Sequence, residues 1–203
     1  MSFYSDRILP HVIHWAMQQE IFTAYRQRLV PAAEGRVLEI GAGSGMNLPF
    51  YSVKAAHVLA LDPSRGLRAL ARRGASGNQS ATWIEATAEA IPLDSRSVDT
   101  VLTTWTLCSI RDVGCALHEV RRVLKPSGKL LFVEHGRAPD AAVRRWQDRM
   151  TPLWKRVAGG CHLNRPVDRL IQDAGFVFES LTTAYMRGPR LMTFMYDGCA
   201  RPK

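Results

Sequence analysis

The stretch Arg36-Val-Leu-Glu-Ile-Gly-Ala-Gly-Ser-Gly45 decides the fold of this chain. Its first half, up to Ile40, is short and apolar, which predicts a buried β-strand. The glycines that follow let the backbone turn sharply and approach a ligand closely, and they are Gly41, Gly43 and Gly45. We therefore expect a ligand site at this loop, with a short helix starting at Met46.

Strand-like and helix-like segments alternate along most of the chain. Further strands are predicted at residues 57–61, 81–84, 98–103 and 129–133, in addition to 36–40. Crossover helices are predicted at 64–73, where Ser64 is a good N-cap, and at 113–124. Successive βα units of this kind predict a mainly parallel sheet in an α/β fold.

The two ends of the chain add other elements. Residues 9–29 form an amphipathic stretch that predicts one added helix, placed as a lid over a pocket. After the fifth strand we expect a Trp-rich helix at 141–157, a break at Gly159-Gly160 and a second helix at 165–174. A closing antiparallel hairpin is then expected, with strands at 176–183 and 190–196 and a short link at 185–189. No linker divides the chain, so we expect a single domain over 1–203, with a lid at 1–30, a cofactor-binding half at 31–135 and an acceptor-side part at 136–203.

The chain carries a formal net charge of +9, which favours contact with nucleic acid, an anionic membrane surface or an acidic substrate. Its paired arginines have no interleaved aromatic side chains for stacking bases, so no nucleic-acid partner is expected. Solvated helix faces explain these pairs most simply, and a peripheral membrane contact is the alternative. The oligomeric state is not indicated.

Neither a signal peptide nor a long apolar segment is recognisable, and this predicts a cytoplasmic protein. The four cysteines have no paired spacing and are expected to be reduced thiols, and they are Cys108, Cys115, Cys161 and Cys199. A structural zinc site needs four suitably spaced ligands, so no metal is expected.

The spacing of the glycines narrows the class of ligand. A dinucleotide fingerprint needs a third glycine at position 46, where this chain has Met46. Instead, Glu39 ends the first strand and Asp62 ends the second, and a carboxylate at such a position accepts hydrogen bonds from ribose hydroxyls. A cofactor with a ribose and a methionine tail but no phosphate fits this pattern, and S-adenosylmethionine is that cofactor.

At this point the sequence resembles the class I S-adenosylmethionine-dependent methyltransferases over nearly its whole length. Beyond the glycine loop, the resemblance includes residues 88–93, 97–99 and 117–128. Within that superfamily the chain is most similar to the small-thiol methyltransferase-like branch, on the marks Thr106-Leu-Cys-Ser109, Phe132-Val-Glu-His135, Trp146, Trp154 and Gly160-Cys-His-Leu-Asn-Arg165.

The resemblance implies a Rossmann-like fold, with a mainly parallel seven-stranded sheet and an antiparallel C-terminal hairpin. It implies that the three glycines surround the methionine part of S-adenosylmethionine, and it assigns the rest of the cofactor site to Glu39, Asn47, Asp62, Pro63, Ser64, Ala88, Glu89, Thr104 and Trp105. The product would be S-adenosylhomocysteine. Many relatives carry Asp where this chain has Thr87, so adenine recognition is expected to rest on Ala88 and Glu89.

Methyl transfer needs little chemistry from the protein, because alignment of the acceptor with the methyl group does most of the work. A thiol or amine acceptor must still lose a proton, and His135 at the end of the fifth strand is the candidate base. The alternative is that His135 only hydrogen-bonds a loop. Cys108, His162 and Arg165 are candidates for the acceptor pocket, and a purely structural role is the alternative for each.

Three functions remain open from the sequence. The first is methyl transfer to a small, hydrophobic acceptor, by resemblance a thiol. The second is methylation of a phospholipid amine or an isoprenoid at a membrane surface, which the charge and the amphipathic N-terminal stretch favour. The third is a non-catalytic cofactor-binding protein, against which the intact glycines and Asp62 argue.

Overall fold

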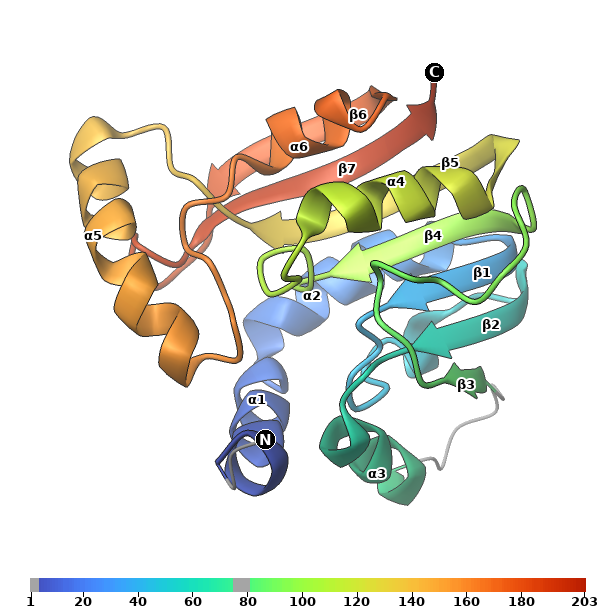
Figure 1. Ribbon diagram of the computed structural model, residues 1–203, viewed down its shortest axis with the longest axis horizontal. Coiled ribbons are helices and arrows are strands. Elements are labelled where there is room, and N and C mark those ends of the chain that lie inside the picture. Colours follow the sequence, from blue (N-terminus) through green and yellow to red (C-terminus); the bar gives the residue numbers. More distant parts are fainter. Residues whose placement is uncertain (1–3, 75–80) are drawn as a thin grey trace.

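The computed structural model of the chain describes residues 4–74 and 81–203. Seven strands form one sheet in the order β3-β2-β1-β4-β5-β7-β6 (Figure 1). Their bounds are Gly35–Ile40 (β1), Ala55–Leu61 (β2), Ala81–Ile84 (β3), Val98–Thr104 (β4), Leu124–His135 (β5), Phe176–Tyr185 (β6) and Phe194–Pro202 (β7). The first five strands are parallel to one another. Strand β7 pairs antiparallel with β5 on one side and with β6 on the other, and β6 and β7 form the C-terminal hairpin that the sequence predicts.

Six α-helices accompany the strands in the described part of the chain. They are Leu9–Met17 (α1), Glu20–Leu29 (α2), Arg65–Gly74 (α3), Val113–Val123 (α4), Ala141–Val157 (α5) and Val167–Asp173 (α6). Short helical turns lie at Tyr4–Ile8, Val30–Ala32 and Leu48–Phe50. The bounds of α5 coincide with the prediction, those of α3 differ from it by one residue at each end, and those of α4 differ by one residue at the C-terminal end.

Alternation along the strands divides the core between the two faces of the sheet. Leu38 and Ile40 of β1 pack with α4 and α6 in the larger cluster of buried side chains. Val37, which points to the other face, packs with Val30 and Tyr51 in a smaller cluster. Both faces are therefore covered, as a parallel sheet requires.

The N-terminal stretch forms two helices, and the prediction of one helix over 9–29 is wrong. The chain breaks at Gln19, whose backbone is extended (φ −60°, ψ 143°). The carbonyl of Met17, at the end of α1, accepts a hydrogen bond from the Arg26 guanidinium at 2.9 Å. The polar run from Gln18 to Glu20 marks this break in the sequence, because it interrupts the apolar spacing.

Three other boundaries differ from the prediction, two of them because of proline. A helix starting at Met46 is replaced by a turn and the short helical segment Leu48–Phe50, since Pro49 has no N–H to continue an α-helix from there. Helix α6 starts at Val167, after Pro166, and not at 165. The hairpin link runs through residue 193, because β7 takes its register from β5, and the link contains a turn in which the Met192 N–H donates to the Pro189 carbonyl at 2.9 Å.

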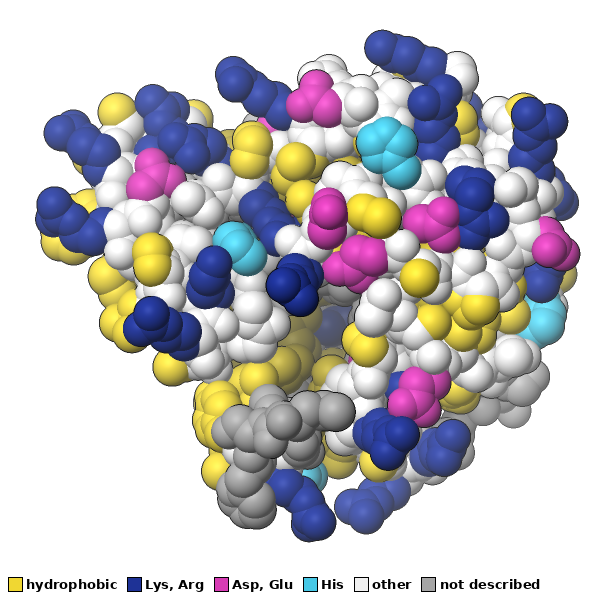
Figure 2. Space-filling view, viewed as in Figure 1, with side chains coloured by type: hydrophobic (Ala, Val, Ile, Leu, Met, Phe, Trp, Pro, Cys, Tyr) yellow, Lys and Arg dark blue, Asp and Glu magenta, His cyan; other side chains and the backbone are white. Residues whose placement is uncertain are grey.

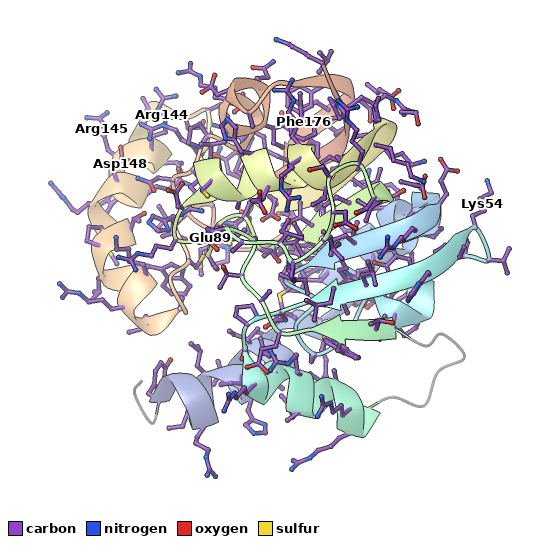
Figure 3. The ribbon with its side chains drawn as sticks, turned by 45° about the vertical axis from the view of Figure 1, so that its right-hand side comes forward. Lys54, Glu89, Arg144, Arg145, Asp148 and Phe176 are labelled. Atoms are coloured by element: carbon purple, nitrogen blue, oxygen red, sulfur yellow. The ribbon has the colours of Figure 1, made fainter. Side chains whose placement is uncertain are left out.

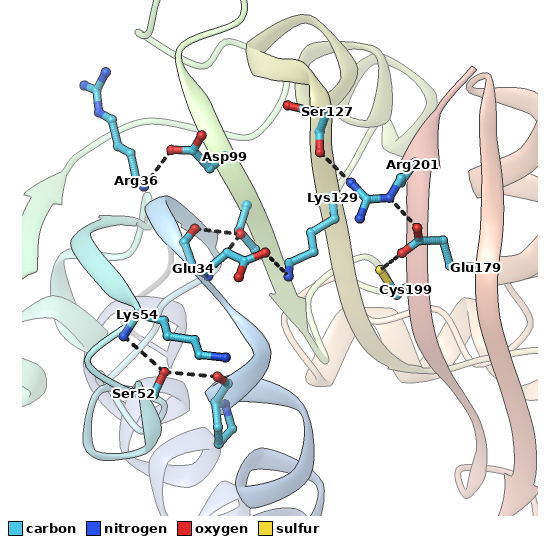
Figure 4. Close-up of polar contacts among 12 residues, drawn as sticks. Glu34, Arg36, Ser52, Lys54, Asp99, Ser127, Lys129, Glu179, Cys199 and Arg201 are labelled. Atoms are coloured by element: carbon cyan, nitrogen blue, oxygen red, sulfur yellow. Dashed lines mark hydrogen bonds and ion pairs between the residues drawn. The ribbon is translucent and has the colours of Figure 1, made fainter.

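A polar network ties the strands together at the edge of the sheet where the parallel strands begin (Figure 4). Lys129 of β5 reaches Glu34 before β1 at 2.5 Å, and the Arg36 N–H donates to Asp99 of β4 at 2.9 Å. Arg201 of β7 contacts Glu179 of β6. The opposite edge, where the parallel strands end, carries the functional site.

Candidate functional site

A cavity of about 460 Å³ lies at the carboxyl ends of β1, β2 and β4, a size typical of small-molecule sites. In Figure 1 these strands point toward α1. Figure 2 shows a hollow near the middle of this face with hydrophobic side chains inside and beside it. Every residue predicted to bind the cofactor lines the cavity except Gly45.

The three glycines of the β1 loop all have positive φ, but their surroundings differ. A Cβ on Gly41 would overlap the Thr106 side chain, and one on Gly45 would lie 3.1 Å from Leu48 Cδ1. A Cβ on Gly43 would meet nothing closer than 3.8 Å. Gly41 and Gly45 are therefore required by the packing of the protein, whereas Gly43 leaves open space beside a ligand.

Asp62, after β2, is buried and organises the loop around it. Its Oδ2 accepts the Gly43 N–H at 2.8 Å, and its Oδ1 accepts the Ser64 N–H at 2.7 Å. Burial raises the pKa of this carboxyl group, and the two backbone hydrogen bonds oppose that rise. Each oxygen keeps a lone pair, so the carboxylate is able to accept further hydrogen bonds from hydroxyl groups in the cavity.

Glu39 stands at the end of β1 in a buried polar cluster. Its two carboxylate oxygens accept hydrogen bonds from Asn47 at 2.8 Å and from the Tyr51 hydroxyl at 2.7 Å. Asn47 in turn accepts from Arg26 at 3.2 Å. Burial raises the pKa of Glu39 to about 7, although the nearby Arg26 guanidinium lowers it.

The elevated pKa of Glu39 leads to a prediction about proton release. We expect the α-ammonium group of S-adenosylmethionine to favour the ionised form of Glu39, so binding near pH 6.5 will release protons. Calorimetric titrations in two buffers with different ionisation enthalpies measure this release. Glu39→Gln should abolish it, and a wild-type titration that is independent of buffer would show that Glu39 is not coupled to the cofactor.

The same shift in pKa has a consequence for stability. Because the native state holds the Glu39 proton up to about pH 7, whereas the ordinary value is 4.5, the contribution of this group to stability falls as the pH rises through that window. The free energy of unfolding of wild type and of Glu39→Gln, measured at several pH values between about 4.5 and 7, isolates this contribution. The other carboxyl groups titrate in both proteins, so their effect cancels in the difference, which should fall as the pH rises.

Residues on the expected adenine side come from the loop after β3. Ala88 is buried, and Glu89 accepts a hydrogen bond from the Asp112 N–H at 3.2 Å. Figure 3 places Glu89 near the centre of the molecule, whereas Lys54 projects from the far edge of the sheet. Thr87, which stands where many relatives carry Asp, also lines the cavity.

Trp105 follows β4 in a strained backbone conformation with φ +50°, which is uncommon for a residue with a large side chain. Its ring packs edge-on against Phe22 at 5.0 Å and Tyr25 at 6.0 Å between ring centroids. The Arg26 guanidinium lies 5.3 Å from the ring centroid. Strain of this kind persists only where the surrounding structure enforces it, and it clusters at functional sites.

The residues predicted for catalysis and for the acceptor pocket lie beside the cavity and not on its wall. His135 Nε2 lies 3.2 Å from Cys161 Sγ. Arg165 donates to the carbonyls of Leu107 and Ile110, and His162 Nδ1 lies 3.1 Å from the Cys108 carbonyl oxygen. These contacts support the loop after β4, and direct contact with an acceptor stays a prediction for all four residues.

Several residues of the site were not found from the sequence. Arg26 of α2 lines the cavity, and the Tyr51 hydroxyl, which follows the glycine loop in the sequence, donates a hydrogen bond to Glu39. His14 on α1 is a possible pocket residue that the sequence does not favour, because a lone histidine is more often a surface or core residue; it hydrogen-bonds Ser44 of that loop, with 2.8 Å between His14 Nδ1 and Ser44 Oγ. No motif marks these side chains, because their roles depend on how the N-terminal helices pack across the sheet.

Comparison with known proteins agrees with this geometry. The methyltransferase domain family matches residues 38–132. The thiol S-methyltransferase TMT1B of Rattus norvegicus is 33% identical over 164 residues, which are 78% of this chain and 67% of that protein. The chain belongs to the class I S-adenosylmethionine-dependent methyltransferases. It is an enzyme of this class, and S-adenosylmethionine is its cofactor.

Other proteins similar to this methyltransferase carry names that refer to different acceptors. A demethylmenaquinone methyltransferase of Clavibacter sepedonicus is 32% identical over 62% of this chain and 51% of its own length. The solved structure of an S-adenosylmethionine-dependent methyltransferase of Thermotoga maritima has the same fold, with a TM-score of 0.72. That protein is described as a possible histamine N-methyltransferase, and it is 22% identical over 98% of this chain and 97% of its own.

The residues present fit S-adenosylmethionine. The open space beside Gly43 admits a ligand close to the backbone, and Asp62 offers a buried acceptor beside it.

Among residues 4–74 and 81–203, no helix combines the length and hydropathy needed to cross a membrane.

Proposed function

We propose that this methyltransferase transfers the methyl group of S-adenosylmethionine to a small, hydrophobic thiol. The observation that carries the proposal is the composition of the cavity wall. Leu9, Ile13 and Met17 of the N-terminal helix contribute apolar side chains, and Trp105 contributes its ring. The relatedness to thiol S-methyltransferases over most of the chain supports a thiol as the acceptor within this apolar wall.

S-adenosylmethionine supplies an activated methyl group when bound, so the protein must mainly position the acceptor and favour its thiolate form. Arg26 is the cationic group on the cavity wall best placed for the second task, because it is buried and adjoins Trp105. A buried positive charge lowers the pKa of a neighbouring thiol. His135 remains the proposed base, and because it lies beside the cavity and not on its wall, it would take the proton through one intervening water molecule.

The proposal assigns a role to each part of the chain. Residues 1–30 act as a lid. The side chains of Leu9, Ile13 and Met17 support this role because they form part of the cavity wall. Residues 1–3 lie outside the described part of the chain. Residues 31–135 bind the cofactor, and 136–203 complete the acceptor side within one domain. A cytoplasmic location belongs to the same proposal, which the four free cysteines support.

A membrane-borne acceptor, such as an isoprenoid or a phospholipid amine, is the second candidate. Helix α1 exposes Val12 and Trp15, and helix α5 exposes Trp146 and Leu153, with Trp15 71% exposed. Figure 3 shows Arg144, Arg145 and Asp148 on α5, so this surface is charged as well as apolar. The relatedness to a demethylmenaquinone methyltransferase also favours this candidate.

Formation of S-adenosylhomocysteine by the purified enzyme tests both candidates. We expect turnover with alkyl and aryl thiols, and none with the corresponding alcohols and phenols, because oxygen is the weaker nucleophile. Anionic phospholipid vesicles, with and without an isoprenoid quinone lacking one methyl group, form the second arm. Turnover only in the vesicle arm would overturn the thiol proposal and establish the membrane acceptor.

A further inference from the structure

Two cysteines and a histidine from distant parts of the chain meet beside the cavity. Cys108 follows β4, His135 ends β5, and Cys161 follows α5. The Sγ atoms of Cys108 and Cys161 and a ring nitrogen of His135 all lie within 4.8 Å of one another. Cys108 is 2% exposed, Cys161 is 9% exposed and His135 is partly exposed, so both sulfur atoms belong to buried residues.

The three segments are positioned by contacts that do not involve these three side chains. The backbone N–H of His162 donates to the Cys108 carbonyl at 2.8 Å, which joins the loop after α5 to the loop after β4. Glu134 accepts the Thr106 and Leu107 N–H groups at 3.0 and 3.1 Å, which joins the latter loop to β5. The cluster is therefore preorganised, as a binding site for a small ion requires.

The donor set selects a class of ion. Two sulfur ligands and one imidazole suit zinc and similar thiophilic ions, whereas calcium and magnesium require oxygen ligands. Around a tetrahedral zinc ion, with bonds of about 2.0–2.3 Å, the ligand atoms lie about 3.4–3.8 Å apart. The 3.2 Å separation of His135 Nε2 from Cys161 Sγ and the 4.8 Å limit for the group lie close to that geometry.

We propose that Cys108, His135 and Cys161 bind a zinc-class ion in this enzyme. The three residues fill three of the four tetrahedral positions and leave one for a small ligand such as water. The ion would cross-link the loop after β4 to the loop after α5, and both loops contribute to the cavity wall, through residues such as Ser109 and Gly159. A His135 ring nitrogen that coordinates the ion cannot take a proton from the acceptor, so this proposal replaces the assignment of His135 as the base. It does not depend on which acceptor the enzyme methylates.

Elemental analysis of the purified, reduced wild-type enzyme by mass spectrometry is the direct test. We expect about one equivalent of zinc per chain, and an absorption spectrum typical of tetrahedral thiolate coordination after replacement by Co²⁺. Cys108→Ser, Cys161→Ser and His135→Gln should each lose most of the bound metal. Cys115→Ser and Cys199→Ser change thiols outside the group and should retain it.

Circular dichroism of each variant shows whether it is folded, and the wild-type measurement does not depend on the variants. Wild-type enzyme that binds neither Zn²⁺ nor Co²⁺ after dialysis against each would overturn the proposal. So would metal that stays at the wild-type level in the Cys108→Ser and Cys161→Ser variants. Recovery of a Cys108–Cys161 disulfide from enzyme purified without reductant, with no metal, would assign the pair to thiol redox chemistry instead.

Discussion

We expect Asp62→Ala to lower the affinity of the enzyme for S-adenosylmethionine by about 100-fold or more, while the folded state persists. The reason is that, in the proposed site, this buried carboxylate would form charge-assisted hydrogen bonds with the ribose hydroxyls, each contributing about 1.5–3 kcal/mol. The substitution also removes the acceptor of the Gly43 and Ser64 N–H groups, which loosens the loops on both sides of the ribose. Burial of a charge without a cofactor is itself unfavourable, so the loss of stability should be smaller than the loss of binding.

Isothermal titration calorimetry with S-adenosylmethionine and thermal unfolding without it measure the two effects separately. Asp99→Ala is the matched control, because Asp99 also accepts a backbone N–H, from Arg36, but does so at the opposite edge of the sheet. This control should change stability and leave the affinity for the cofactor near that of the wild type. An Asp62→Ala variant that binds the cofactor as tightly as Asp99→Ala does would remove Asp62 from the ribose site.

The parallel half of the sheet was predictable because its signals are local. Each of its strands is a short apolar run bounded by turn residues, and the glycine loop and Asp62 follow directly from strand ends. Once two strands are adjacent and parallel, their carboxyl ends meet at one edge, so Glu39 and Asp62 had to be neighbours. Thr104 and Trp105, which the family resemblance assigned to the cofactor site, also line the cavity.

Features that depend on long-range packing were not predictable in this way. The break at Gln19 orients α2 so that Arg26 reaches Asn47 and Trp105, and this requires both helices to be docked first. The hairpin shifted toward the C-terminus because β7 takes its register from β5, pairing Met195 with His135.

His135 shows where prediction from strand ends stops. The sequence places it correctly at the functional edge, but neighbouring residues of a strand point to opposite faces. Glu134 accepts hydrogen bonds from Thr103 and from the loop after β4, whereas His135 lies against Cys161 in the loop after α5 and near Cys108. Which loop covers each face is decided by the path of the chain after α5, and no local pattern encodes that path. Cysteines that look isolated in the sequence therefore meet in the structure.

Gly43→Ala should abolish most cofactor binding at a small cost in stability, and this separates a glycine needed for the ligand from glycines needed for the fold. Gly43 has φ +57°, and a residue with a side chain in that region loses about 1–2 kcal/mol. A new Cβ would contact only the Gly41 carbonyl oxygen at 3.8 Å and Leu67 Cδ1 at 3.9 Å, which are ordinary distances. The added methyl group would instead project toward the space that we assign to the cofactor.

Overpacking at a close contact costs about 1–3 kcal/mol, so we expect the dissociation constant of S-adenosylmethionine to rise by about 10- to 100-fold. Gly188→Ala is the control, because Gly188 also has positive φ (+135°) but lies outside the cavity; it should lose stability and retain binding. Gly41→Ala should unfold more readily than either, since its Cβ would overlap Thr106. If Gly43→Ala keeps wild-type affinity, the glycine serves only the turn, and the cofactor must approach the loop from another direction.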